Sequence, residues 1–163
     1  MGGYLGNQPD AIKPPTLIFS NTTDVGTDAN ETEKDLISYT MPANKLVGNG
    51  HKLKIIASGT TPATGNTKQI RLKFGSATIL DTTAIVSNLK DWKIEGEVIR
   101  TGSATQDSTT SGIFNDALVV PDYQALTEDL TSTVVIKVTG QNGATGAAND
   151  IVCENLTVEL IET

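Results

Sequence analysis

Short runs in which apolar and polar residues alternate are the feature that most limits how this chain can fold. Leu53, Ile55 and Ala57 have the opposite parity to Lys52 and Lys54, and Ile70, Leu72 and Phe74 are separated by Arg71 and Lys73. The same alternation returns over residues 92–98, 134–138 and 157–160. Because successive side chains of a strand point to opposite faces, this period of two predicts strands with one buried face.

Clusters of Gly, Pro, Asn and Thr separate these runs and predict turns. Threonine occurs 24 times in the 163 residues, and branched side chains favour strands over helices. The sequence therefore predicts an all-β fold: an antiparallel β-sandwich of jelly-roll type with eight to nine strands. We expect one domain over residues 16–163, preceded by an extended arm over residues 1–15.

Three stretches carry more specific expectations. Residues 101–112 contain no large apolar residue and predict a long loop. Residues 122–130 place Tyr123, Leu126 and Leu130 at helical spacing and predict a helical turn. Gly96, inside a strand pattern, predicts either a bulge or the close approach of another segment.

Charge and composition exclude several classes of protein. The formal charge of −7 disfavours nucleic-acid binding unless the lysines gather on one face. No run approaches the length of a membrane span, and a single cysteine cannot form an intramolecular disulfide. We expect neither a membrane nor a nucleic acid as partner.

Catalytic equipment is sparse, since the chain has one His and one Cys. His51 follows a turn and is expected to be exposed, while Cys153 shares the parity of Ile151 and is expected to be buried. Glu95 and Glu97 point the same way from one strand, which is typical of a solvated face. The sequence predicts no enzyme, no cofactor and no metal site.

Five basic residues within residues 52–73 form the strongest charge pattern: Lys52, Lys54, Lys68, Arg71 and Lys73. No acidic residue interrupts them, and the two strands that carry them are expected to form a hairpin with a basic outer face. This face would either bind an acidic surface, such as the acidic loop 24–35 of a neighbouring copy, or simply be solvated. We take Lys52, Lys54, Arg71 and Lys73 as candidate partner-binding residues.

The first fifteen residues contain three Gly and three Pro and end in a Pro pair. Their only large apolar side chains after Met1 are Tyr4, Leu5 and Ile12. The segment is either a flexible leader or an arm that orders when these three side chains dock on a partner.

Two stretches resemble bacteriophage virion proteins. GGYLGNQP, at residues 2–9, resembles the short arms that begin many head and tail fibre proteins. MPANKLVGNGHKLKIIASGTTPATGNTKQIRLKFG, at residues 41–75, resembles a hairpin of small phage structural domains, and residues 91–102 continue the likeness.

The resemblance implies a jelly-roll domain displayed on a virion, commonly as a trimer. Of the functions it implies, we favour a capsid decoration (cement) protein whose arm binds the major capsid protein or another virion protein. A head or tail fibre component that contacts host glycans is the alternative, and a free carbohydrate-binding module lies outside this class. The outward apolar residues Ile56, Ile99 and Val135 are in keeping with a homotrimer.

Overall fold

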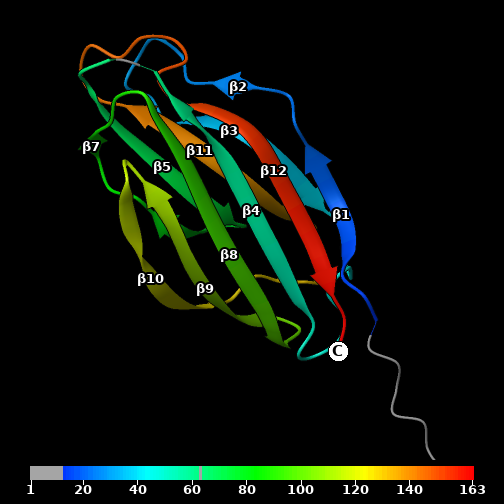
Figure 1. The fold of residues 1–163 in the computed structure, drawn as a ribbon. Coiled ribbons are helices and arrows are strands. Elements are labelled where there is room, and N and C mark those ends of the chain that lie inside the picture. The colour runs from blue at the N-terminus through cyan, green and yellow to red at the C-terminus, as the bar shows by residue number, and fades with distance from the viewer. Residues whose placement is uncertain (1–12, 63) are drawn as a thin grey trace, which may run out of the picture.

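Two antiparallel sheets stacked face to face make up the chain in a computed structural model that describes residues 13–62 and 64–163 (Figure 1). The described residues form twelve strands: β1 (Thr16–Asn21), β2 (Val25–Gly26), β3 (Lys34–Met41), β4 (Lys52–Thr61), β5 (Thr67–Phe74), β6 (Ala77–Asp81), β7 (Ile85–Val86), β8 (Lys90–Gly102), β9 (Thr105–Phe114), β10 (Ala117–Leu126), β11 (Val134–Asn142) and β12 (Val152–Ile161). They contain no helix that is long and apolar enough to cross a membrane.

The order of the strands is that of a jelly roll. The larger sheet runs β1-β12-β4-β8-β9-β10, with β2 paired to β12, and the smaller sheet runs β3-β11-β5-β6, with β7 paired to β5. The chain passes repeatedly from one sheet to the other, as in two interleaved Greek keys. The predicted antiparallel sandwich is therefore confirmed.

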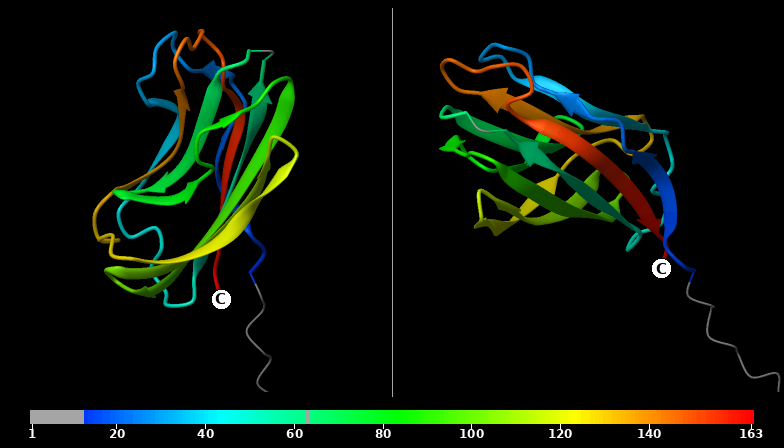
Figure 2. Two further views of the ribbon diagram at one scale, coloured as in Figure 1. Left: turned by 90° about the vertical axis from the view of Figure 1, so that its left-hand side faces the viewer. Right: turned by 45° about the horizontal axis from the view of Figure 1, so that its top comes forward.

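The strand count differs from the prediction for an identifiable reason. Eight strands make the jelly roll itself, and the hairpin β9–β10 extends the larger sheet beyond β8. Two further strands, β2 and β7, are only two residues long. Figure 2 shows the sheets edge on, with β9 and β10 bending from the larger sheet toward the smaller one.

Two predictions of local structure were wrong. Residues 105–112 are not a loop but most of β9, and residues 122–126 are not a helical turn but the end of β10. The inward side chains of β9 at Gln106, Ser108 and Thr110 are polar, so this strand lacks the apolar alternation that marks the others.

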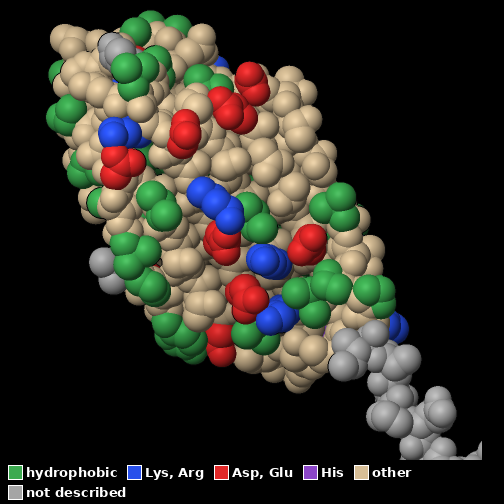
Figure 3. All heavy atoms as spheres, in the orientation of Figure 1, with side chains coloured by type: hydrophobic (Ala, Val, Ile, Leu, Met, Phe, Trp, Pro, Cys, Tyr) green, Lys and Arg blue, Asp and Glu red, His purple; other side chains and the backbone are tan. Residues whose placement is uncertain are grey.

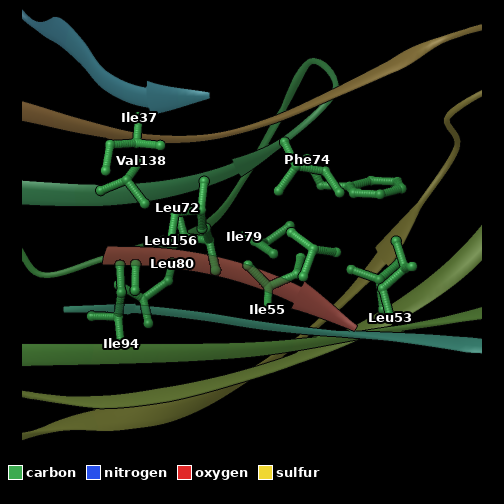
Figure 4. Close-up of a cluster of buried hydrophobic side chains, with 14 of the residues drawn as sticks. Ile37, Leu53, Ile55, Leu72, Phe74, Ile79, Leu80, Ile94, Val138 and Leu156 are labelled. Carbon is green, nitrogen blue, oxygen red and sulfur yellow. The ribbon is translucent and has the colours of Figure 1, made fainter. Parts of the chain in front are cut away.

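The core consists of the inward side chains of both sheets (Figure 4). Leu53, Ile55 and Ile94 of the larger sheet face Leu72 and Phe74 of the smaller one, and all five are fully buried. Cys153 is buried as predicted, and Trp92 is buried as well. At the β1–β3 edge, the rings of Phe19 and Tyr39 stack with centroids 4.8 Å apart.

Gly96 is a point of close approach and not a bulge. Its pairing with Ile55 and Thr110 is regular on both sides. A Cβ atom added there would lie 2.9 Å from Leu72 Cδ2 and 3.3 Å from Ile79 Cδ1 of the facing sheet. A side chain at this position would therefore crowd the core.

Candidate functional site

The predicted basic hairpin does not exist, because its two strands belong to different sheets. Lys52 and Lys54 lie on β4 in the larger sheet, whereas Arg71 and Lys73 lie on β5 in the smaller one. The chain crosses between the sheets in the turn that follows β4. Strands that are adjacent in sequence are thus not partners here, and the basic residues face opposite sides of the sandwich.

Arg71 and Lys73 contact acidic residues of their own chain. Glu33, from the loop between β2 and β3, lies 3.2 Å from Arg71 Nη1 and 2.5 Å from Lys73 Nζ. Arg71 Nε also donates to Asp81 over 3.0 Å. The sequence suggested the acidic loop of a neighbouring copy as a partner for this basic surface, whereas in the structure Arg71 and Lys73 contact Glu33 in the acidic loop of their own chain.

The ion pairs change the titration of both carboxyl groups. Desolvation raises the pKa of Glu33, but hydrogen bonds from Lys73 and Thr139 and the charge of Arg71 outweigh it, so the pKa lies below its usual value. For Asp81, desolvation is likewise outweighed by hydrogen bonds from Gln69, Thr83 and Arg71, which lower its pKa.

The sequence predicted Lys68 on the basic outer face, and this prediction was wrong. It is fully buried, on the inward side of β5. Its Nζ donates to the carbonyl oxygens of Thr64, Asn66 and Ser87 and to Asn66 Oδ1, over 2.7 to 3.3 Å. Burial lowers the pKa of Lys68, and the charge of nearby Asp150 opposes this effect. Lys68 therefore links the loop between β4 and β5 to the loop between β7 and β8, and it is not accessible to a partner.

Lys52 and Lys54 lie on the outer face of the larger sheet, among glutamates. Lys52 Nζ is 3.1 Å from Glu97 Oε1. Lys54 is paired in register with Glu97 on β8 and with Glu159 on β12. Figure 3 shows acidic and basic side chains alternating across the middle of this face. The two lysines belong to a surface of mixed charge.

A hollow of 350 Å³ lies beside Lys54 on this face. Its outward-facing lining residues are Lys54, Glu95, Glu97, Thr109, Ser111 and Pro121. Glu95 and Glu97 project the same way from β8, as the sequence predicted, and both are half-buried. We call this depression the outer-face hollow.

Sequence reasoning missed part of the outer-face hollow because it assigned residues 101–112 to a loop. Thr109 and Ser111 come from β9, and Thr109 pairs in register with Tyr123 of the neighbouring strand β10. The density of threonine and serine in residues 105–111 was the one available signal of a strand.

A second depression of 570 Å³ separates the free edges of the two sheets. It lies between β6 and the β9–β10 hairpin, and its apolar lining includes Ile79, Ile85, Phe114 and Val119. Thr110 Oγ1 donates across it to the carbonyl of Ile79 over 3.0 Å. This edge of the sandwich is therefore less tightly closed than the β1–β3 edge.

His51 and Cys153 are far apart. Lys52 pairs with Ile161 and Gly59 with Cys153, so His51 and Cys153 lie at opposite ends of β4, roughly 26 Å apart at the usual rise of a strand. His51 is half-buried rather than exposed, and its Nδ1 accepts from the Gly48 amide over 3.3 Å. Burial raises the pKa of the Cys153 thiol to about 12. The structure does not bring the two together as a catalytic pair.

Other predicted contacts fall elsewhere. Tyr4, Leu5 and Ile12 lie outside the described residues. Ile56 and Ile99 lie on the larger sheet and Val135 on the smaller one, so these three do not form a single patch. Residues 13–62 and 64–163 contain no cluster of three or more His, Cys, Asp or Glu side chains that could hold a metal ion.

No family model and no curated protein matches the chain. Among solved structures, the chain is similar to the CBM2 module of the evolved Dit of Lactobacillus casei BL23 phage J-1. The sequence identity is 9%, the match covers 77% of this chain and 69% of that one, and the TM-score is 0.37. A likeness this distant carries no argument about ligand or partner.

Proposed function

We propose that the chain is a structural protein of a bacteriophage virion, a capsid decoration protein that binds the particle through residues 1–15. The resemblance of residues 2–9 and 41–75 to phage virion proteins supports this assignment. A jelly roll whose His and Cys lie far apart is in keeping with a binding role rather than catalysis.

The position of the arm's root is the observation that carries the proposal. Lys13 lies beside Glu162, with Nζ and Oε2 3.2 Å apart, so the arm joins the sandwich next to the C-terminus. This junction is at one end of the molecule (Figure 1). Attachment through the arm leaves the outer faces of both sheets uncovered.

If it is fully extended on the particle, an arm of this length would reach well beyond the domain. Twelve residues precede Lys13, and a fully extended chain of that length spans about 40 Å. Tyr4 and Leu5 would bury apolar surface between capsid subunits, and this surface would become exposed to water again only when the shell comes apart. Binding that favours the assembled state stabilises it by mass action.

The partner is therefore the major capsid protein or another virion protein, and the site of action is the virion. The homotrimer remains a prediction. Sedimentation of the purified chain at micromolar concentration tests it, and a monomer would contradict it.

The test of the proposal is a double substitution in the arm, Tyr4→Ala with Leu5→Ala. Binding is measured by co-sedimentation with purified heads of the phage that encodes the chain. We expect the double variant to stay in the supernatant while its melting temperature equals that of the unaltered chain. Thr40→Ala, on the outer face of the smaller sheet, is the control and should co-sediment normally. Normal binding by the double variant would overturn the proposal.

A further inference from the structure

We propose that the outer-face hollow binds a neutral saccharide. The inference goes beyond the attachment role proposed above and does not depend on the arm. It rests on the polar groups that line the hollow, on the balance of charge around it, and on the position of Tyr123.

The lining offers both donors and acceptors that the described residues do not use. Thr109 and Ser111 present hydroxyl groups from β9, and Lys54 presents an ammonium group from β4. No described residue forms a side-chain hydrogen bond with these three groups. A sugar hydroxyl both donates and accepts a hydrogen bond, so a ring with several hydroxyl groups is complementary to such a mixture.

Ion pairs hold the two carboxylates in place. Lys93 Nζ lies 2.5 Å from Glu95 Oε1, and Lys52 Nζ lies 3.1 Å from Glu97 Oε1. Each pair uses one oxygen of its glutamate and leaves Oε2 available to a ligand. A side chain already fixed by a neighbour loses less conformational entropy when it binds. The two glutamates are thus oriented acceptors for sugar hydroxyl groups.

The charge around the hollow favours a neutral ligand. Lys52, Lys54 and Lys93 share this face with Glu95, Glu97 and Glu159, and the face also carries Asp91, Asp107 and Glu154, so acidic residues outnumber basic ones. An anionic ligand is therefore disfavoured. Glu95 and Glu97 are each paired with a lysine, which reduces the attraction that they would exert on a cationic ligand. The volume of 350 Å³ lies at the lower end of small-ligand sites and fits one or two sugar rings.

Tyr123 supplies an aromatic face beside Thr109, one of the residues that line the hollow. Glu97, Thr109 and Tyr123 are cross-strand neighbours on one row of the outer face. The side chain is 62% exposed, so its ring is accessible. A hydrogen bond to Asp107 raises the pKa of Tyr123. The C–H face of a sugar ring packs against such a surface while its hydroxyl groups meet the polar side chains.

The experiment is an NMR titration of the isotope-labelled full chain with glucose, galactose, mannose and N-acetylglucosamine at millimolar concentrations. We expect at least one of these sugars to shift the amide signals of residues 95–97 and 109–111 in a saturable way. Tyr123→Ala and Glu97→Gln should each weaken binding about tenfold or more, which corresponds to 1.4 kcal/mol. Thr40→Ala, on the opposite sheet, should leave binding unchanged.

Two results would overturn the saccharide site. One is that none of the four sugars shifts these amide signals in a saturable way. The other is binding that both Tyr123→Ala and Glu97→Gln leave unaltered although each variant melts within a few degrees of the unaltered chain. Co-sedimentation of Tyr123→Ala with phage heads keeps the two proposals distinguishable, because only the arm is expected to matter there.

Discussion

At the scale of single residues, two glycines show where the packing leaves no room. Gly96 faces the ends of two flexible side chains, Leu72 and Ile79, whereas Gly59 faces backbone. A Cβ atom on Gly59 would lie 1.9 Å from the carbonyl oxygen of Val152 and 2.7 Å from the ring of Trp92. Alternation of residue types identified Gly96 as unusual but had no means of identifying Gly59, since its constraint comes from a strand that is distant in sequence.

The two glycines predict unequal costs for the same substitution. Gly96→Ala should lower the free energy of unfolding by about 1 kcal/mol, because the methyl groups of its neighbours can move. Gly59→Ala should lower it by more than about 3 kcal/mol, since neither a carbonyl nor a packed indole can yield. Urea unfolding of both variants measures the difference. Equal costs would contradict the packing described for Gly59.

Lys68 shows that strand parity is informative even for a charged residue. It shares the parity of Ile70, Leu72 and Phe74, and parity alone would have placed it inward. A general preference of lysine for solvent placed it outward instead. The carbonyl oxygens that satisfy its ammonium group belong to loops whose positions no sequence pattern reveals.

We expect Lys68→Met to lower the free energy of unfolding by about 3 kcal/mol, because it leaves several buried oxygens without their donor and removes the positive charge near Asp150. The matched control is Lys137→Met, on the surface of β11. Lys137 forms a surface ion pair with Asp35 at 2.8 Å, so its replacement should lower the free energy of unfolding by less than about 1 kcal/mol. Chemical denaturation compares them, and a cost for Lys68→Met no larger than that of the control would refute the buried role.

At the scale of elements, strands with apolar inward faces were predictable and β9 was not. Its inward residues Gln106, Ser108 and Thr110 are polar, and the side chain of each is hydrogen-bonded to backbone. Gln106 exchanges hydrogen bonds with the backbone of Glu128, and Ser108 donates to the carbonyl of Gln124. Polar residues can occupy a core when such partners exist, but the partners appear only once the fold is formed.

Thr110→Val tests this account of β9. The substitution keeps the shape of the side chain but removes the donor to the Ile79 carbonyl, which links the two sheets. We expect a loss of about 1.5 kcal/mol in the free energy of unfolding. Thr109→Val, one residue earlier on the outer face, should change it by less than about 0.5 kcal/mol. Equal effects in thermal or urea unfolding would argue against a linking role for Thr110.

Two carboxyl groups make the stability of the fold depend on pH: Glu33 in the loop between β2 and β3, and Asp81 at the end of β6. Glu33 and Asp81 have pKa values below their usual 4.5 and 3.8 in the folded chain, so the unfolded chain binds protons first as the pH falls. Their contribution is complete above about pH 5 and is lost as the pH falls through the lowered folded values.

We therefore expect the urea midpoint to fall between about pH 5 and pH 2, and Glu33→Gln to reduce that fall. Glu31→Gln, at an exposed position of the same loop, is the control and should leave the profile unchanged. A profile that Glu33→Gln does not alter would show that the loop is not held by this carboxylate.

At the scale of the whole molecule, the class of fold followed from alternation and turn spacing, but the division of strands between sheets did not. Assigning β4 and β5 to one hairpin was reasonable for neighbours in sequence, yet a jelly roll sends them to opposite sheets. That error split the predicted basic surface in two. It also concealed the face on which Lys54, Glu97 and Thr109 meet.

Cryo-electron microscopy of the virion tests the central claim most directly, because it shows which part of the chain contacts the particle. We predict density for the two-sheet domain on the outside of the capsid, with residues 1–15 traced between capsid subunits and the outer face of the larger sheet exposed. A particle that carries the domain through either sheet face, with residues 1–15 free of contact, would contradict the account.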